Sequence, residues 1–354
     1  MNVLGYAAYA ADAPLAPFRF ERRTPRHDDV VIDILYCGVC HTDLHQVRNH
    51  RGASRYPIVP GHEVIGRVRS VGPAVTRFKP GDTVGVGCMV DSCRHCVACE
   101  SGHEQHCATS PTFTYGSTDR HDQTRTFGGY SESIIVSDGF VLRVPEGMDL
   151  AGAAPLLCAG ITTWAPLRRW QVGPGSRVAV MGLGGLGHMA LKLAKGLGAD
   201  VTLFTRSSGK EADARRLGAD RVVISTDAAQ MAACAGRFDL IIDTVPYVHA
   251  LTPYLPTLSF DGTLVLVGYM GALDEQLNTA PLVYGGRAVA GSFIGGVAET
   301  QEMLDFCGQH GISSDVEVIR VQQIDEAYER MLKSDVKYRF VIDMSSLKSQ
   351  ELDA

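Results

Sequence analysis

The sequence predicts an α/β protein with two domains, one irregular and rich in β-strands, the other built on a doubly wound parallel sheet. Short β-like segments separated by turn residues fill roughly the first 150 residues, whereas strands alternate with helices from there to about residue 295. A glycine-rich turn also follows directly on the first strand of the alternating region.

Length and composition agree with this division. A chain of 354 residues, of which 45% are hydrophobic and 20% charged, is long enough for two separate cores. The formal net charge of -6 disfavours nucleic acid or an anionic membrane as the main partner, so we expect a small-molecule substrate. We find no apolar stretch of membrane-spanning length and no secretory signal pattern. We therefore expect a cytoplasmic protein whose cysteines serve as thiols and metal ligands.

The β-rich region has strand candidates at 30–36 and 64–68, and turn sequences such as Lys79-Pro80-Gly81-Asp82 recur between such segments. This region does not show the pattern of regular helices that would cover a parallel sheet. We expect an irregular, barrel-like β domain.

The alternating region has a buried-type strand at 177–181 and helical spacing over 189–197. Further strand candidates lie at 201–204, 221–224, 240–244 and 263–267. This alternation predicts a doubly wound parallel sheet. Beyond it we expect helices at 300–309 and 324–332, a closing strand at 339–343 and a frayed end at 345–354.

These patterns give the predicted domain boundaries. One domain comprises residues 1–153 and 296–354 and includes a cysteine-rich lobe at about 88–110. The other domain comprises residues 154–295.

The glycine-rich turn reads Gly182-Leu183-Gly184-Gly185-Leu186-Gly187 and lies between a strand and a helix. In this context Gly182 permits the tight turn, Gly184 lets the backbone approach a pyrophosphate, and Gly187 allows close packing of helix and strand. A plain structural turn is the alternative. The motif predicts a dinucleotide cofactor bound at the helix N-terminus.

The residues at the end of the next strand indicate whether the cofactor is NAD or NADP(H). An NAD site usually carries an acidic residue about 20 residues after the glycines. Here the segment reads Thr205-Arg206-Ser207-Ser208-Gly209-Lys210, without a carboxylate. Hydroxyl and cationic groups can bind a 2′-phosphate, so we predict NADP(H); NAD remains the alternative if Arg206 and Lys210 only begin a solvated helix.

Four cysteines, Cys93, Cys96, Cys99 and Cys107, stand close together in the spacing Cys-x2-Cys-x2-Cys-x7-Cys. Four thiolates suit a closed, tetrahedral structural zinc. An iron–sulfur cluster is the competing interpretation, because thiolate spacings overlap. The unequal last gap and a second, mixed-ligand site elsewhere favour zinc.

The mixed-ligand site lies between Cys40 and Glu63. Thiolate, imidazole and carboxylate from Cys40, His62 and Glu63 are ligands of a zinc that does chemistry, and the Thr42 hydroxyl lies near them in sequence. A third protein ligand is needed. Cys158 is a candidate because it lies where the two domains meet in sequence, although a cysteine in an apolar run is more often buried core.

With these residues, the chain resembles the zinc-dependent medium-chain alcohol dehydrogenases, within them the cinnamyl alcohol dehydrogenase branch. The resemblance covers nearly the whole chain. It rests on Gly38-Val39-Cys40-His41-Thr42-Asp43-Leu44-His45, Gly61-His62-Glu63, the four-cysteine lobe, Phe127-Gly128-Gly129-Tyr130, Cys158-Ala159-Gly160, Gly182 to Gly187, Gly291-Ser292-Phe293-Ile294-Gly295-Gly296 and Asp335-Val336-Lys337-Tyr338-Arg339-Phe340. It implies a GroES-like fold for the β-rich, catalytic domain and a Rossmann fold for the other.

The resemblance also implies residue roles. Cys40, His62 and Cys158 would hold a catalytic zinc, with Glu63 as an intermittent ligand. Thr42 would bond the substrate oxygen and pass its proton towards His45. The implied cofactor contacts are His41, the glycine-rich turn, Thr205, Arg206, Ser207, Lys210, Thr244, Val267, Ser292 and Ile294.

The implied reaction is the NADP(H)-dependent interconversion of primary alcohols and aldehydes, aromatic or medium-chain, with two zinc ions per chain. A zinc-free quinone or enoyl reductase, or an NADP-binding sensor without turnover, are the alternatives. The family also implies a homodimer, with strand candidates at 263–267 and 288–293 pairing across a two-fold edge.

Two segments depart from the family pattern. The family's plant enzymes often carry an acidic residue a few places after the relay histidine, where this chain reads Asn49-His50-Arg51-Gly52. The segment 116–126 is unusually charged for a position near a substrate channel, and we expect it to be a solvated loop.

Overall fold

The computed structural model of the chain describes residues 1–268, 271–273 and 276–348. The fold divides into two compact units. Unit 1 comprises Met1–Cys158 and the chain from Gly296 onward, and unit 2 comprises Ala159–Gly295. The first division therefore falls a few residues beyond the boundary predicted from the sequence.

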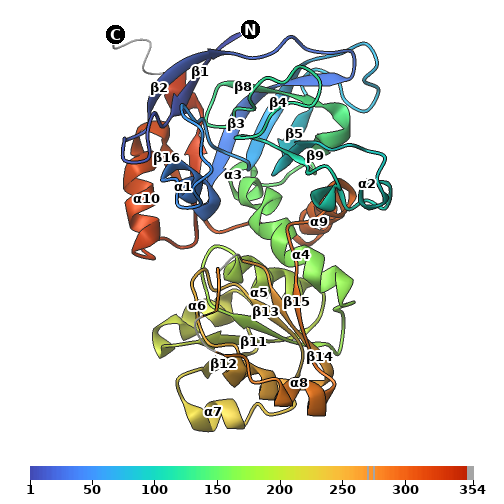
Figure 1. Ribbon diagram of the computed structural model, residues 1–354, viewed down its shortest axis with the longest axis vertical. Helices are drawn as coiled ribbons and strands as arrows, with labels where there is room; N and C mark the ends of the chain where they lie inside the picture. Colours follow the sequence, from blue (N-terminus) through green and yellow to red (C-terminus); the bar gives the residue numbers. More distant parts are fainter. Residues whose placement is uncertain (269–270, 274–275, 349–354) are drawn as a thin grey trace. The chain divides into compact units, whose positions relative to one another are not determined.

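Unit 1 is built on a mixed seven-stranded sheet (Figure 1). Six strands lie in the order β16-β17-β3-β4-β5-β9, and β8 also pairs with β3. Only β16 and β17 pair in parallel; the other pairs of this sheet are antiparallel. The strands are β3 (Asp29–Val39), β4 (Val64–Val71), β5 (Thr83–Val86), β8 (Ser133–Ser137), β9 (Leu142–Arg143), β16 (Val316–Arg320) and β17 (Arg339–Asp343).

Two small sheets complete the β structure of unit 1, β1 (Asn2–Ala7) with β2 (Ala16–Glu21) and β6 (Met89–Asp91) with β7 (Thr112–Phe113). Short, mostly antiparallel strands in several sheets confirm the predicted irregular β-rich fold. The helices are α1 (His41–Val47), α2 (Val97–Glu100), α3 (Leu150–Ala153), α9 (Val297–His310), α10 (Ile324–Leu332) and α11 (Ser345–Lys348), with 3-10 turns η1 (Glu104–His106), η2 (Asp138–Phe140), η3 (Ala154–Leu157) and η6 (Val321–Gln323).

The end of the chain differs from the prediction. Residues 345–348 form α11 instead of a frayed end, because this segment is anchored by its side chains: Leu347 is fully buried and the Ser346 hydroxyl accepts a hydrogen bond from the Val321 N–H at 2.9 Å. Residues 349–354 lie outside the described residues.

Unit 2 is a parallel sheet of six strands in the order β12-β11-β10-β13-β14-β15. The strands are β10 (Arg177–Met181), β11 (Asp200–Thr205), β12 (Arg221–Ile224), β13 (Phe238–Asp243), β14 (Leu258–Leu266) and β15 (Ala288–Gly291). The helical segments are α4 (Ala159–Arg169), α5 (Gly187–Gly196), α6 (Glu211–Arg216), α7 (Ala228–Ala232) and α8 (Ala280–Gly285), with η4 (Ser208–Lys210) and η5 (Thr252–Thr257).

The strand order of unit 2 reverses between β10 and β13, which is the doubly wound topology expected from the sequence. The alternating apolar runs fill the core: Phe204 and Phe238 pack edge to face with ring centroids 5.3 Å apart. Ligands of such sheets bind outside the carboxyl ends of the strands at the reversal.

Within the described ranges no single helix is long and apolar enough to cross a membrane; the bent pair 150–157 and 159–169 meets the length and composition criteria only when its two segments are taken together.

Candidate active site

The pairing of strands in the unit 1 sheet brings the first group of predicted zinc ligands together, at one end of its central strands. In the pairing of β3 with β4, Cys37 lies opposite Val64, so the end of β3 and the start of β4 are neighbours. Cys40 follows β3, and Glu63 immediately precedes β4. The pairing of Val39 with Phe340 brings Arg339 on β17 to the same end.

Cys158 reaches this end from α3 and η3, which contact β3, β4, β5 and β17. Its sulfur lies 4.0 Å from that of Cys40. One ligand atom from each of Cys40, His62, Glu63 and Cys158 lies within 4.8 Å of the others, and all four residues are buried. The structure therefore places together the four residues that the sequence analysis named for one metal site.

Cys40 is the N-cap of α1. Its sulfur accepts a hydrogen bond from the Thr42 N–H at 3.4 Å, and the Asp43 carboxylate accepts one from the Cys40 N–H at 2.9 Å. The pKa of the Cys40 thiol is lowered well below its ordinary value by the hydrogen bond from Cys158 and by the positive charge of Arg339. A thiolate at this position is prepared to bind a cation.

His62 is oriented by a second contact of Asp43. Its Nδ1 lies 3.0 Å from Oδ1 of Asp43, whereas its Nε2 is buried and has no hydrogen-bond partner within the described chain. A histidine whose Nδ1 is held by a carboxylate and whose Nε2 is bare has the arrangement of a metal ligand. The sequence analysis did not assign a role to Asp43, because an acidic residue in the first turn of a helix is usual for capping.

Glu63 is fully buried and its Oε1 accepts a hydrogen bond from Arg339. Oε2 of Glu63 has no hydrogen-bond partner within the described chain. Burial raises the pKa of Glu63 to about 7, although Arg339 opposes this shift. A Cβ at Gly38 would lie 1.9 Å from Oε2 of Glu63, so this glycine makes room for the carboxylate. Arg339 is thus a residue of this site. It was not assigned from the sequence, because it lies far along the chain from the other site residues.

Thr42 and His45 lie on α1 beside this ligand group, and both are half-buried. His41, also half-buried, has a pKa lowered by burial. The rings of His41 and His45 are 6.3 Å apart, and the side chain of His45 lies against that of His50. The three histidines therefore form a line along α1 and the turn that follows it.

The second ligand group contains the four cysteines of the lobe around α2 and η1. One sulfur from each of Cys93, Cys96, Cys99 and Cys107 lies within 4.8 Å of the others. The pKa of Cys96 is lowered to about 7 by the Ala108 N–H. Although burial raises it, the pKa of Cys107 is lowered to about 5 by backbone N–H groups, first that of Cys93. Thiolates favoured by backbone donors suit a metal site.

The glycine-rich turn of unit 2 lies between β10 and α5. Gly182 has φ +86°, and a Cβ at Gly187 would lie 2.1 Å from the Gly182 carbonyl oxygen. A Cβ at Gly184, by contrast, would meet open space. The first and third glycines thus serve the turn and the packing, and the second leaves the backbone open for a ligand, as the motif predicts.

The predicted 2′-phosphate contacts gather at the end of β11. Lys210 donates a hydrogen bond from Nζ to the Leu183 carbonyl oxygen at 3.1 Å, which brings it back across the glycine-rich turn. Arg206 donates to the Tyr247 hydroxyl at 3.1 Å and lies over its ring. Thr205 is buried, and Ser207 is exposed. Burial and Arg206 lower the pKa of Lys210. Tyr247 is a further candidate that the sequence analysis missed.

The other predicted cofactor residues lie at neighbouring strand ends. Thr244 follows β13 and donates from Oγ1 to the Met181 carbonyl oxygen at 2.7 Å. Val267 follows β14. The Ser292 N–H donates to the Leu266 carbonyl oxygen at 3.0 Å, and Ile294 has φ +36°. These positions lie at the carboxyl ends of β13, β14 and β15.

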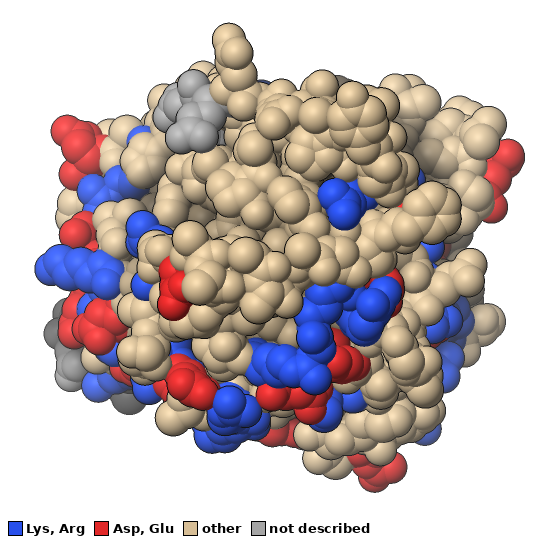
Figure 2. Space-filling view, turned by 90° about the horizontal axis from the view of Figure 1, so that it is seen from below, with Lys and Arg blue, Asp and Glu red and all other residues tan. Residues whose placement is uncertain are grey.

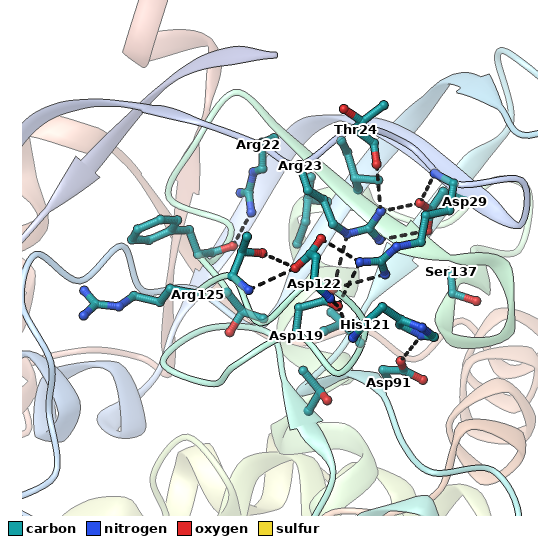
Figure 3. A pocket seen from close by; sticks show the side chains of 18 of the residues that line it. Arg22, Arg23, Thr24, Asp29, Asp91, Asp119, His121, Asp122, Arg125 and Ser137 are labelled. Atoms are coloured by element: carbon teal, nitrogen blue, oxygen red, sulfur yellow. Dashed lines mark hydrogen bonds and ion pairs between the residues drawn. The ribbon is translucent and has the colours of Figure 1, made fainter.

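Much of the charged segment 116–126 is exposed, as expected of a solvated loop, and Asp119 and Asp122 also form ion pairs with the chain before β3. Arg26 pairs with Asp119 at 2.9 Å and with Asp122 at 2.7 Å, and Arg23 lies 3.3 Å from Asp119. Figure 3 shows Arg23, Asp29, Asp119 and Asp122 pointing toward one another across a cavity of about 520 Å³. The carboxylates stay in place because fixed guanidinium groups neutralise them.

Comparison with known proteins agrees with the fold and with a zinc-binding dehydrogenase. Residues 26–146 match the alcohol dehydrogenase GroES-like domain, and residues 185–309 match the zinc-binding dehydrogenase domain. The chain is 52% identical to an aldehyde reductase of Escherichia coli (98% of this chain, 99% of that protein) and 50% identical to an NADP-dependent alcohol dehydrogenase of Mycolicibacterium smegmatis (98% and 99%).

Two solved structures are similar over 98% of this chain. One is a cinnamyl alcohol dehydrogenase of Sorghum bicolor, with 47% identity, a TM-score of 0.93 and 98% of that chain covered. The other is a CAD of Helicobacter pylori complexed with NADP(H), with 40% identity, a TM-score of 0.90 and 99% covered. The matches to the GroES-like domain and to the zinc-binding dehydrogenase model define the class of protein. The chain belongs to the zinc-dependent medium-chain alcohol dehydrogenases, and the likeness extends to their cinnamyl alcohol dehydrogenase branch.

Proposed function

We propose that this protein interconverts primary alcohols and aldehydes with NADP(H), at a zinc site formed by Cys40, His62 and Cys158. The observation that carries the proposal is the buried ligand group of unit 1, in a chain about half identical to NADP-dependent alcohol dehydrogenases. In the oxidative direction a primary alcohol and NADP+ give an aldehyde, NADPH and one proton.

The residues fit a zinc ion. Two thiol sulfurs and one unpartnered imidazole nitrogen are ligands that zinc prefers, and the lowered pKa of Cys40 supplies a thiolate. Glu63 is a fourth candidate, which Arg339 holds through one oxygen while the other is unpartnered. We propose that Glu63 ligates only when no other oxygen ligand is present.

Zinc bound here would act as a Lewis acid on the substrate oxygen, and NADP(H) would accept or donate the hydride. Residues of the chain itself orient the zinc ligands and transfer the proton. Asp43 fixes His62 and the Cys40 backbone together, so the ligands keep one geometry. Thr42 holds the substrate hydroxyl by a hydrogen bond and passes its proton on, and His45 carries the proton away from the site.

The cofactor site is proposed at the carboxyl ends of the unit 2 strands. The backbone at Gly182 to Gly187 would receive the pyrophosphate at the start of α5. Arg206, Lys210, Thr205 and Ser207 would bind the 2′-phosphate of NADP(H). Thr244, Val267, Ser292 and Ile294 would border the rest of the cofactor.

The four-cysteine lobe is proposed to hold a second, structural zinc. Four sulfurs leave no place for substrate, so this ion would stabilise the fold of the lobe. We also propose that unit 1 is the catalytic domain and unit 2 the dinucleotide-binding domain, and that the protein acts in the cytoplasm.

A homodimer through the edge of the unit 2 sheet is part of the proposal. β15 is an end strand, and edge strands present backbone groups that can pair with a second copy. Near it, Phe260, Val283 and Tyr284 are 86%, 75% and 91% exposed. Figure 2, which shows the underside of Figure 1 where α7 and α8 lie lowest, has a broad area without Lys, Arg, Asp or Glu. A Val283→Glu variant should become monomeric by light scattering, whereas Leu332→Glu in α10 should not.

The substrate is proposed to be an aromatic or medium-chain aliphatic aldehyde, with reduction as the direction favoured by NADPH. The test is a kinetic panel of benzaldehyde, cinnamaldehyde and aliphatic aldehydes with NADPH, run on protein of measured zinc content. We expect turnover that Cys40→Ser or Cys158→Ser abolishes while the fold persists. Undiminished turnover in either variant would contradict the ligand assignment.

A further inference from the structure

The side chains of His45 and His50 face each other at hydrogen-bond distance. Their Nδ1 atoms are 2.9 Å apart, and their rings are 5.2 Å apart with an interplanar angle of 57°. In such a contact one Nδ1 must carry the proton and the other must accept it. His45 is half-buried and His50 is exposed, so the pair links the interior of unit 1 to solvent.

The turn after α1 creates this contact. Asn49 has φ +52°, a left-handed conformation that asparagine tolerates better than most residues. The chain therefore doubles back, and the His50 N–H donates to the His45 carbonyl oxygen at 3.0 Å. The Asn49 side chain accepts a hydrogen bond from the Ser54 N–H at 3.0 Å, which holds the turn in place.

We propose that His50 is the outer member of the proton path, so that protons pass between His45 and solvent through an imidazole–imidazole hydrogen bond. The inference rests on the proposed function, because only a reaction that releases or consumes protons needs such a path. It gives a role to His50, which lies in the segment that departs from the family pattern.

The step balances without any other reactant. During alcohol oxidation Nε2 of His45 accepts a proton, Nδ1 of His45 gives its proton to Nδ1 of His50, and Nε2 of His50 releases one proton to water. Aldehyde reduction runs the same transfers backwards. No electrons move and one proton crosses the pair.

The surroundings of His45 favour transfer over retention of the proton. Burial lowers the pKa of His45, and the charges of His41, His50 and Arg51 lower it further, whereas Cys40 opposes them. These are the titratable and charged groups that act on His45. A neutral His45 accepts a proton only transiently, which suits a relay.

A carboxylate at position 50 can accept a proton from His45, whereas an alanine cannot. His50→Asp should therefore retain most of the wild-type kcat, and His50→Ala should not. If His50 only stabilised the turn, aspartate would replace it no better than alanine.

The experiment compares zinc-loaded wild type with His50→Ala, His50→Asp and the control His27→Ala, an exposed histidine of the same unit. We expect His50→Ala to lower kcat for alcohol oxidation about 3- to 10-fold, since water replaces one relay group. Its kcat should rise with the concentration of a non-coordinating buffer, whereas wild type and His27→Ala should not respond. Imidazole is avoided because it binds zinc.

A second measurement does not depend on turnover. Nitrogen-15 NMR of the zinc-loaded protein without cofactor should show a proton on Nδ1 of only one of the two histidines. In His50→Ala the pKa of His45 should rise, because a neighbouring positive charge is lost. An unchanged protonation state and pKa of His45 would overturn the inference.

The relay and the proposed function fail in distinguishable ways. If the wild type turns over no aldehyde or alcohol, the proposed function is wrong and the relay falls with it. If the wild type is active and His50→Ala matches its kcat, pH profile and buffer independence, only the relay is wrong.

Discussion

Oδ1 of Asp43 lies 3.0 Å from Nδ1 of His62, and both side chains are buried. The same carboxylate accepts hydrogen bonds from the Cys40 N–H at 2.9 Å and the Gly61 N–H at 3.1 Å. One acidic residue therefore fixes two predicted zinc ligands that are far apart in sequence. Its contribution to the site is orientation, because its own oxygens are already engaged.

Asp43→Asn should weaken zinc binding at the catalytic site about 10- to 100-fold, because an amide cannot orient His62 and hold both N–H groups equally well. Competition with a chelator, followed by zinc analysis, measures the change. Asp33→Asn, which alters an exposed carboxylate paired with Arg69, is the control. Equal zinc retention in Asp43→Asn and wild type would contradict the role of Asp43.

Cys93→Ser should lower stability before it affects the chemistry, because the closed four-sulfur site contributes folding energy. Urea unfolding should show a midpoint well below that of Cys40→Ser, whose fold we expect to persist. The assignment of Cys93 to a structural metal would be wrong if both variants unfolded like the wild type.

Lys210→Ala and Arg206→Ala should weaken NADPH binding by about 10- to 100-fold each and NADH binding little, since a charge-assisted contact to phosphate contributes roughly 1.5–3 kcal/mol. Fluorescence titration with both cofactors measures the ratio. Arg215→Ala, in which an exposed arginine paired with Glu211 is lost, should bind both cofactors like the wild type. Parallel losses for NADPH and NADH would argue against 2′-phosphate recognition.

Asp119→Asn should reduce the free energy of unfolding by about 1 kcal/mol at neutral pH, because Arg23 and Arg26 lose a partner. Although burial raises it, the hydrogen bond from Arg26 lowers the pKa of Asp119 below its ordinary value. A carboxylate with a lowered pKa stabilises the fold above its unfolded pKa, and this stabilisation is lost as the pH falls through the folded value.

The difference between wild type and Asp119→Asn should therefore shrink as the pH falls below about 4. Urea unfolding of both proteins between pH 7 and pH 3 measures it. A difference that stayed constant over this range would show that charge pairing across the Figure 3 cavity is not its source.

Regular elements were predictable from sequence where the pattern is local. The strands at 177–181, 221–224 and 339–343 and the helix at 324–332 have the predicted bounds, because apolar periodicity and turn residues define them. The helix α11 was missed because Leu347 is buried only through contacts that its own segment does not reveal.

The site was predictable where motifs bring ligands close in sequence. The spacing of the four cysteines and the glycine-rich turn indicated their chemistry directly. Cys158 was one candidate among buried cysteines until the family resemblance singled it out. Arg339 and Tyr247 could not be assigned, because only strand register and tertiary packing bring them to the sites.

The most direct test of the central claim is the rate of NADPH consumption with an aromatic or medium-chain aldehyde, measured for wild type and Cys158→Ser at known zinc content. We predict turnover by a wild type that holds about two zinc ions per chain, and no turnover by a Cys158→Ser variant that keeps the four-cysteine zinc. Equal rates for the two proteins, or turnover by wild type freed of zinc, would contradict the account.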